Sequence, residues 1–360
     1  MSNDLSNSIN QQLNNLDLTK LEEFFNNLIG NINNENLISI IKNILTGNSS
    51  LDLSSLFNYF VSLLFNNILN FLPTFISIIA IGVLMSVLHS ARGSFVNESV
   101  YEIAYLVFKL AIAIILFSQI FEFYKNTKIT IENIAKLSEI MSPIILTLML
   151  AVGGNVSVNV YKPAVLILSN GIISIIINVV FPLIIFMTIF NVINGFSNSI
   201  KFDKFSSFAV STIKWVLGII VCVFTIFLTI QGLTSARYDG ISYKIAKYTI
   251  SNTVPIIGSF LKDGFDIVIA GSIIIKNAIG FAVIIMIFYI ILSPVLNMVV
   301  FSLLLKLTSA LLEPICDSNI SNFCLSISNT ITYLIVSLLA VGFMFFILVV
   351  LMTLSASAFI

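Results

Sequence analysis

Residues 331–354, with the sequence ITYLIVSLLAVGFMFFILVVLMTL, decide the fold class of this chain. The stretch contains no charged residue, and a helix needs about 20 mostly apolar residues to cross the hydrocarbon core of a bilayer. It therefore predicts a transmembrane α-helix. Seven further mostly apolar stretches precede it, at 66–88, 103–123, 138–153, 164–193, 211–232, 266–292 and 295–312.

The composition of the chain supports the same conclusion. Of its 360 residues, 58% are hydrophobic and only 9% are charged, whereas an ordinary soluble domain is about 25% charged. A soluble fold with so little charge could not cover its own surface, so the solvent must be lipid. We therefore predict an all-α, polytopic membrane protein with about eight transmembrane helices. The 17 basic and 17 acidic residues balance, which gives no reason to expect nucleic acid as a partner.

The N-terminal region, residues 1–55, is polar and rich in asparagine. Its apolar residues recur at helical spacing, and a second short helix is predicted at 37–45. These helices either lie on a membrane surface or a partner, or form a cap on the protein's own membrane domain. The first residues lack the basic and apolar regions of a secretory signal. We expect either that the first span directs insertion or that a leader has been removed.

Three sequence markers occur twice, in the same order and on corresponding predicted helices. They are Ser90-Ala91-Arg92 and Ser235-Ala236-Arg237 at helix ends, Ser142-Pro143 and Ser293-Pro294 at the start of later spans, and Pro163 and Pro314 after an equal interval. This predicts two similar four-helix halves, 60–200 and 205–360, with a polar or re-entrant insert near 240–265. Because four is even, we expect both halves to enter the membrane in the same direction.

The sequence contains no motif for an enzyme active site, a cofactor or a metal. His89 is the one histidine, and Cys222 lies in an apolar run, whereas a zinc site needs three or four ligands. Cys316 and Cys324 lie in a polar connection. They could form a disulfide in an oxidising space or remain two small apolar side chains.

Two groups of residues are candidates for function. The repeated Ser-Ala-Arg ends place Arg92 and Arg237 where they could line a shared vestibule or dock a partner, although anchoring in lipid headgroups also explains an arginine there. Lys109 and Lys276 lie within apolar segments, and charges in a membrane usually mark function. We expect both to face a cavity. Pro143 and Pro294 either permit gating bends or shape static kinks.

The chain resembles a known family in its most distinctive part. The two Ser-Ala-Arg ends, the stretch TSARYDGISYKIAKYTISNTVPIIGSFLKDGFDIVIAGSIIIKNAIG (234–280) and the stretch LSPVLNMVVFSLLLKLTSALLEP (292–314) are similar to the stage III sporulation protein AE family of endospore-forming Firmicutes. The similarity covers about 60–355. It implies a multi-span subunit of an assembly that links mother cell and forespore, in the mother-cell-derived membrane, beside ring-forming partners. No enzymatic activity is implied.

Three functions remain open at this point. The first is a channel or export-platform subunit of that sporulation complex, and the second is a secondary transporter whose halves rock around a central site. The third is a structural scaffold. Ion-coupled transport is disfavoured because Asp and Glu are almost absent from the predicted spans.

Overall fold

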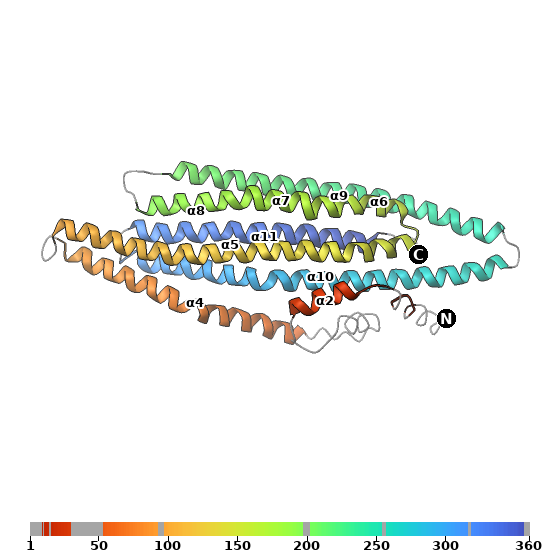
Figure 1. The fold of residues 1–360 in the computed structure, drawn as a ribbon, viewed down its shortest axis with the longest axis horizontal. Coiled ribbons are helices and arrows are strands. Elements are labelled where there is room, and N and C mark those ends of the chain that lie inside the picture. Colours follow the sequence, from red (N-terminus) through yellow and green to blue (C-terminus); the bar gives the residue numbers. More distant parts are fainter. Residues whose placement is uncertain are drawn as a thin grey trace.

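The computed structural model describes residues 9, 11–13, 16–29, 53–92, 97–196, 202–253, 257–315 and 318–355. The regular structure of these residues is helical, and Figure 1 shows the long helices lying side by side along one axis. The elements are α2 (Thr19–Ile29), α4 (Leu53–Ser90), α5 (Glu98–Ala151), α6 (Asn155–Leu166), the π-helix η1 (Ile167–Ile172), α7 (Ile173–Ile175), the π-helix η2 (Ile176–Val180), α8 (Phe181–Phe196), α9 (Asp203–Thr253), α10 (Ile257–Leu312) and α11 (Ser318–Leu354).

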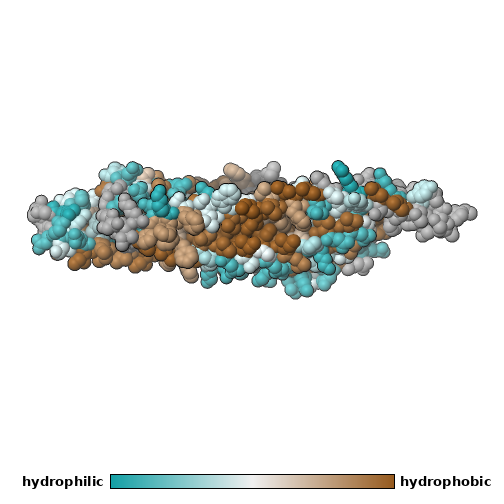
Figure 2. Space-filling view, turned by 90° about the horizontal axis from the view of Figure 1, so that it is seen from above, coloured by the Kyte–Doolittle hydropathy of each residue, from teal (hydrophilic) through white to brown (hydrophobic). Residues whose placement is uncertain are grey.

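Among the described residues, six helices are long and apolar enough to cross a membrane. They are α4, α5, the continuous run α6 to α8, α9, α10 and α11. The predicted all-α, polytopic class is confirmed. Seen from the side of α9, apolar side chains form a broad area in the middle of the surface, with hydrophilic side chains toward both ends and along one edge (Figure 2).

The eight predicted segments lie on these six helices, because α5 and α10 each carry two of them. The charged stretch between the two segments of α5 lowers the local hydropathy. Its buried face nevertheless stays at helical spacing through Thr127, Ile131, Ile134 and Leu137. Helical periodicity, rather than mean hydropathy, therefore determines that the helix continues. With 54 residues, α5 is about 80 Å long, far more than the roughly 30 Å hydrocarbon core.

The overlong predicted segment 164–193 forms one continuous helical run, α6 to α8, rather than two spans. Pro182 is the second residue of α8, directly after the π-helical stretch η2. A proline removes one backbone donor and crowds the preceding turn. The wider π-helical turn before it accommodates this change without breaking the helix.

The two proposed halves run in opposite directions. The ranges 60–200 and 205–360 each contain three long helical runs, and successive runs alternate in direction (Figure 1). As a result, α4 points toward one end of the molecule and α9, its counterpart, points toward the other. The expectation of a common direction is therefore wrong, because it rested on an even number of spans per half.

The hairpin of α10 and α11 is held together by paired serines. The hydroxyl groups of Ser302 and Ser328 are hydrogen-bonded at 2.8 Å, and those of Ser309 and Ser321 are hydrogen-bonded at 2.9 Å. Each hydroxyl also reaches the partner residue's carbonyl oxygen. Within each helix the two serines are seven residues apart, so both pairs lie on the same seam. Small residues of this kind allow close approach of helices in membranes.

The described part of the N-terminal region packs against the protein's own helices. Leu18, Leu21 and Phe25 are buried, and α2 lies against α5. The amide of Gln12 donates to the Val268 carbonyl at 3.1 Å. Asp17 accepts the Thr19 N–H at the start of α2, and its pKa is below the usual value because the side chain and backbone of Thr19 both donate to it. The second predicted short helix, at 37–45, lies outside the described residues.

Candidate functional site

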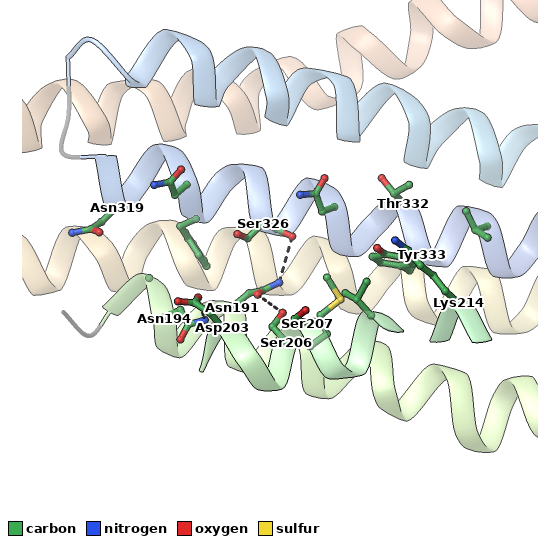
Figure 3. A pocket seen from close by; sticks show the side chains of 17 residues that line it. Asn191, Asn194, Asp203, Ser206, Ser207, Lys214, Asn319, Ser326, Thr332 and Tyr333 are labelled. Carbon is green, nitrogen blue, oxygen red and sulfur yellow. Dashed lines mark hydrogen bonds between the residues drawn. The ribbon is translucent and has the colours of Figure 1, made fainter. Parts of the chain in front are cut away.

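A polar cleft opens between α8, α9 and α11 at the end of the bundle where these helices turn (Figure 3). Its volume is about 980 Å³. Its polar lining consists of amides, hydroxyls and two charged groups: Asn191, Asn194, Asp203, Ser206, Ser207, Lys214, Asn319, Asn322, Ser326, Asn329, Thr332 and Tyr333. Such a lining is unusual, because most small-molecule pockets are lined mainly by apolar side chains.

The wall contributed by α11 has a regular pattern. Asn319, Asn322, Ser326, Asn329 and Tyr333 follow one another at intervals of three and four residues, so they share one face of the helix. The lining continues along α11 for about 25 Å, at 1.5 Å per residue. The cleft therefore runs from the helix turns to the start of the apolar stretches 211–232 and 331–354.

Hydrogen bonds between side chains of the cleft hold some of its polar groups in place. Buried Asn191 donates to Thr330 Oγ1 at 3.1 Å and to the Ser326 carbonyl at 3.4 Å, and it accepts from Ser206 at 3.0 Å. Nearer the turn, Asn194 donates to Asp203 at 3.0 Å. These bonds hold α8 against both α9 and α11, and they keep the cleft walls in place.

Other groups remain available for a ligand. The side chains of Asn322 and Asn329 are exposed, and within the described part of the chain neither has a hydrogen-bond partner. An amide without a partner is costly outside water. The cleft therefore fits water or another polar, mostly uncharged molecule, with Lys214 at its inner end.

At the opposite end of the bundle a second set of polar groups is fully enclosed. Asp239 of α9 is completely buried and accepts the backbone N–H groups of Val156 and Ser157 at 2.8 and 2.9 Å. It thereby caps the N-terminus of α6, where a negative charge is favoured by the helix dipole. Ser157 also bonds to Ser235 at 3.1 Å. We call this set, with Tyr161, Lys276 and Ser355, the buried polar cluster.

The rest of the buried polar cluster joins α10 and the end of α11 to α6. Lys276 of α10 is fully buried and donates to the Ser355 carbonyl. The Ser355 hydroxyl bonds to the hydroxyl of Tyr161 on α6 at 2.8 Å. Tyr161 in turn lies so close to α9 that a Cβ at Gly232 would be 2.5 Å from its hydroxyl oxygen. The small residue at position 232 is therefore required for this contact.

The two Ser-Ala-Arg ends lie at opposite ends of the molecule. Arg92, next to exposed Ser90 and half-buried Ala91, pairs with Glu98 at the start of α5 and lies over the Tyr101 ring at 4.7 Å. Ser235 belongs to the buried polar cluster beyond the other end of α5, and Arg237 is exposed there. Because the length of α5 separates Arg92 from Arg237, the two arginines do not line a shared vestibule. The side chain of Ala236 lies outside the described residues.

The remaining predicted positions have separate surroundings. Lys109 is buried, lies over the Tyr105 ring at 4.8 Å and borders a small cavity beside Gly195 and Phe323. Pro294, inside α10, borders another cavity next to α5, whereas Pro143 is exposed inside α5. Neither proline stands at the entrance of a span, because each lies within a continuous helix.

Sequence reasoning missed both the cleft and the role of Asp239. The intervals of three and four between polar residues from Asn319 to Tyr333 were a detectable signal for a polar helix face. The spacing of four between Ser235 and Asp239 also indicated a shared face. No local pattern could show that this face meets the start of α6, because that contact joins residues more than 80 positions apart.

Together the fold and the cleft define a polytopic α-helical membrane protein with a polar recess between its helices. Residues 35–356 match the family model for stage III sporulation protein AE, and the chain belongs to this family of sporulation membrane proteins. Stage III sporulation protein AE of Bacillus subtilis (strain 168) is 23% identical over 338 residues, covering 92% of this chain and 84% of the relative. No solved structure gives a significant match.

Proposed function

We propose that this chain is the multi-pass subunit of a channel or secretion-like complex that connects mother cell and forespore. In this proposal it lies in the mother-cell-derived membrane, works beside ring-forming partner proteins and catalyses no reaction. Membership of a sporulation membrane family supports the setting. The observation that carries the molecular role is the polar cleft, whose exposed amides at Asn322 and Asn329 provide hydrogen bonds to a polar molecule within an apolar bundle.

The cleft also lies at the junction of the two proposed halves. Its walls come from α8 of the first half and from α9 and α11 of the second. A passage formed in a complex would extend this recess, with amides and hydroxyls replacing bulk water along the route. Partner subunits would cover the side of the cleft that α8, α9 and α11 leave open.

The test compares exposed and buried asparagines of the same cleft. We expect Asn322→Leu with Asn329→Leu to reduce heat-resistant spores at least tenfold while the amount of protein in the membrane stays unchanged. Asn191→Leu is the matched control, because it removes the bonds that join α8, α9 and α11 and should lower protein stability instead. Normal sporulation in the double variant would refute a role for the cleft.

A secondary transporter remains the second candidate, because the two halves run in opposite directions, as in many transporters. It requires a substrate site that the isolated protein can use. Purified protein in proteoliposomes should then carry a small polar solute without partners. Under the channel proposal, the protein shows function only together with the other subunits.

A further inference from the structure

A second polar recess lies between the charged stretch of α5 and the π-helical part of the run α6 to α8. Its volume is about 360 Å³. We call it the charged groove, and no described residue lines both this groove and the polar cleft. Its polar lining comes from both walls: Glu132, Lys136 and Glu139 of α5, Ser169 and Asn170 of η1, Ser174 of α7 and Asn178 of η2.

The charged groove lies at mid-depth of the membrane-spanning bundle. At one end of the run α6 to α8, Asn191 bonds to α9 and α11, and at the other end Tyr161 contacts α9 and bonds to the residue that follows α11. The apolar stretches 211–232 and 331–354 run between these same contacts. The distance from Tyr161 to Asn191 is about 45 Å at 1.5 Å per residue, and the groove residues stay at least about 12 Å from either end. A hydrocarbon core of about 30 Å centred on this distance includes the groove.

The outward faces of α9 and α5 differ in chemistry at this depth. Ile219 and Val223 of α9 are exposed by 51% and 61%, as expected of side chains that face lipid. On α5, Lys136 and Glu139 are exposed and the side chain of Glu132 is 46% exposed. Charges at the centre of a bilayer are costly unless they face a polar interior or a water-filled cavity. This face of α5 is therefore not a lipid-facing surface.

The order of the charges on α5 favours water over a docked helix. Lys128, Glu132, Lys136 and Glu139 alternate in sign at intervals of four, four and three residues, and the first two form an ion pair at 4.0 Å. Alternating signs along one face are typical of a helix exposed to solvent. Because the signs balance, a partner helix with a single kind of charge would not match this face.

The opposite wall of the charged groove also needs a polar medium. The hydroxyl oxygen of Ser169 is buried, and within the described part of the chain it has no hydrogen-bond partner. The side chain of Asn170 is exposed next to it. A polar group without a partner is costly in an apolar setting, whereas water satisfies such a group where the space is polar and large enough, as it is here. Both residues belong to η1, and π-helical turns within longer helices are frequent at functional sites.

We propose that the charged groove is one wall of a water-filled passage that admits small ions to the middle of the membrane. Another chain of the assembly closes the passage on the side that α5 and the π-helical turns leave open. The inference goes beyond the proposed function, because it assigns water and small ions to residues outside the cleft. The predicted segments 103–123 and 138–153 leave Glu132 and Lys136 between them, and the structure places these charges at mid-depth.

The first test measures which face of the bundle water reaches. Membranes from sporulating cells carry single cysteines at groove positions, Lys136→Cys or Glu139→Cys, or at α9 positions of the same depth, Ile219→Cys or Val223→Cys. The three native cysteines are replaced. A methanethiosulfonate reagent with a permanent charge reacts with the thiolate, which forms in water and not in an apolar setting. We expect the groove cysteines to react at least tenfold faster than the α9 cysteines, and all four to react alike after SDS solubilisation.

Equal rates in the membrane would mean that lipid or protein covers the charged groove, and they would overturn the proposal. A nitroxide label on Lys136→Cys gives an independent measurement. A water-soluble nickel complex should relax this label more strongly than a label on Val223→Cys, whereas dissolved oxygen should favour the α9 label. The reverse order would likewise contradict a water-filled groove.

The second test asks whether the charges keep water in the groove. With Glu132→Cys as the reporter, Lys136→Leu together with Glu139→Leu should slow its labelling at least fivefold. The exchange Lys136→Glu with Glu139→Lys keeps both charges and should preserve the labelling rate. An unchanged rate in the leucine variant would sink the proposal, because the charges would then not be the cause of the water.

The labelling rates separate this inference from the proposed function. The Asn322→Leu, Asn329→Leu variant alters only the cleft, so the cysteines of the charged groove should react at their usual rate in it. Fast labelling of the groove together with normal sporulation of that variant would refute the role of the cleft alone. Slow labelling of the groove together with loss of spores in that variant would refute the water-filled passage alone.

Discussion

The two ends of the bundle use the same polar chemistry in opposite ways. At one end, the cleft exposes amides from α11 that have no partner among the described residues, such as Asn322 and Asn329. At the other end, the buried polar cluster pairs Asp239, Ser235 and Tyr161 with groups on neighbouring helices. The polar residues at the two ends thus differ in whether their hydrogen bonds are already made within the protein.

The two occurrences of the repeated Ser-Ala-Arg sequence have different surroundings for the same reason. After the end of α4, the arginine pairs with Glu98 at the start of α5. Within α9, the serine helps to join α6 and the arginine is left on the surface. Equal local sequence therefore does not place two residues in one site, because the fold separates them by the length of α5.

The largest expected effect is an all-or-none difference in labelling. In a background without the three native cysteines, single cysteines at Arg92 and Arg237 should react from opposite sides of the membrane with an impermeant thiol reagent. A cysteine at Ser207, in the cleft, should be labelled from the same side as the cysteine at Arg92. Lysed cells provide the control for reactivity. If the cysteines at positions 92 and 237 were labelled from the same side, the two halves could not run in opposite directions. A non-additive effect of Arg92→Ala and Arg237→Ala on sporulation would also contradict this arrangement.

The next effect concerns stability and compares one aspartate from each end. Asp239→Ala leaves the backbone N–H groups of Val156 and Ser157 without their acceptor, and the one on Ser157 is buried, so the change should lower the free energy of unfolding by about 2–4 kcal/mol. Asp203→Ala removes an exposed carboxylate from the cleft and should cost much less. Unfolding of the purified variants in mixed SDS micelles, followed by circular dichroism, measures both. Equal losses would mean that Asp239 is not the cap that its geometry describes.

A smaller effect tests the close contact inside the buried polar cluster. Gly232→Ala places a methyl group 2.5 Å from the Tyr161 hydroxyl oxygen and 3.6 Å from the ring carbon that carries it. We expect a loss of about 1–3 kcal/mol in the native background, because the side chain must shift. In a Tyr161→Phe background the oxygen is gone, and the same change should cost far less. A double-mutant cycle gives the coupling directly, and additive losses would show that the contact is relieved elsewhere.

The sequence was sufficient for the class of fold and insufficient for the site. Apolar runs such as 331–354 predict membrane helices because lipid forces every backbone group to bond within its own helix. Mean hydropathy nevertheless predicted two separate segments in α5, one on each side of its charged stretch. An average over a window does not register that Ile131 and Ile134 keep one face of the helix buried. The cleft depends on which faces of α8, α9 and α11 meet, and those contacts are formed between residues distant in sequence.

The smallest expected effect on stability is that of replacing Lys276, a charged residue that is buried among the helices. Lys276 is fully buried, and its ammonium group donates to the Ser355 carbonyl. Replacing a buried charge with an apolar side chain of similar volume removes both a hydrogen bond and a desolvation penalty, so the two changes oppose each other. Lys276→Met should therefore fold and change the free energy of unfolding by no more than about 1.5 kcal/mol, measured as for Asp239. A loss as large as that of Asp239→Ala would show that the ammonium group, and not only the aspartate cap, holds this end of the bundle closed.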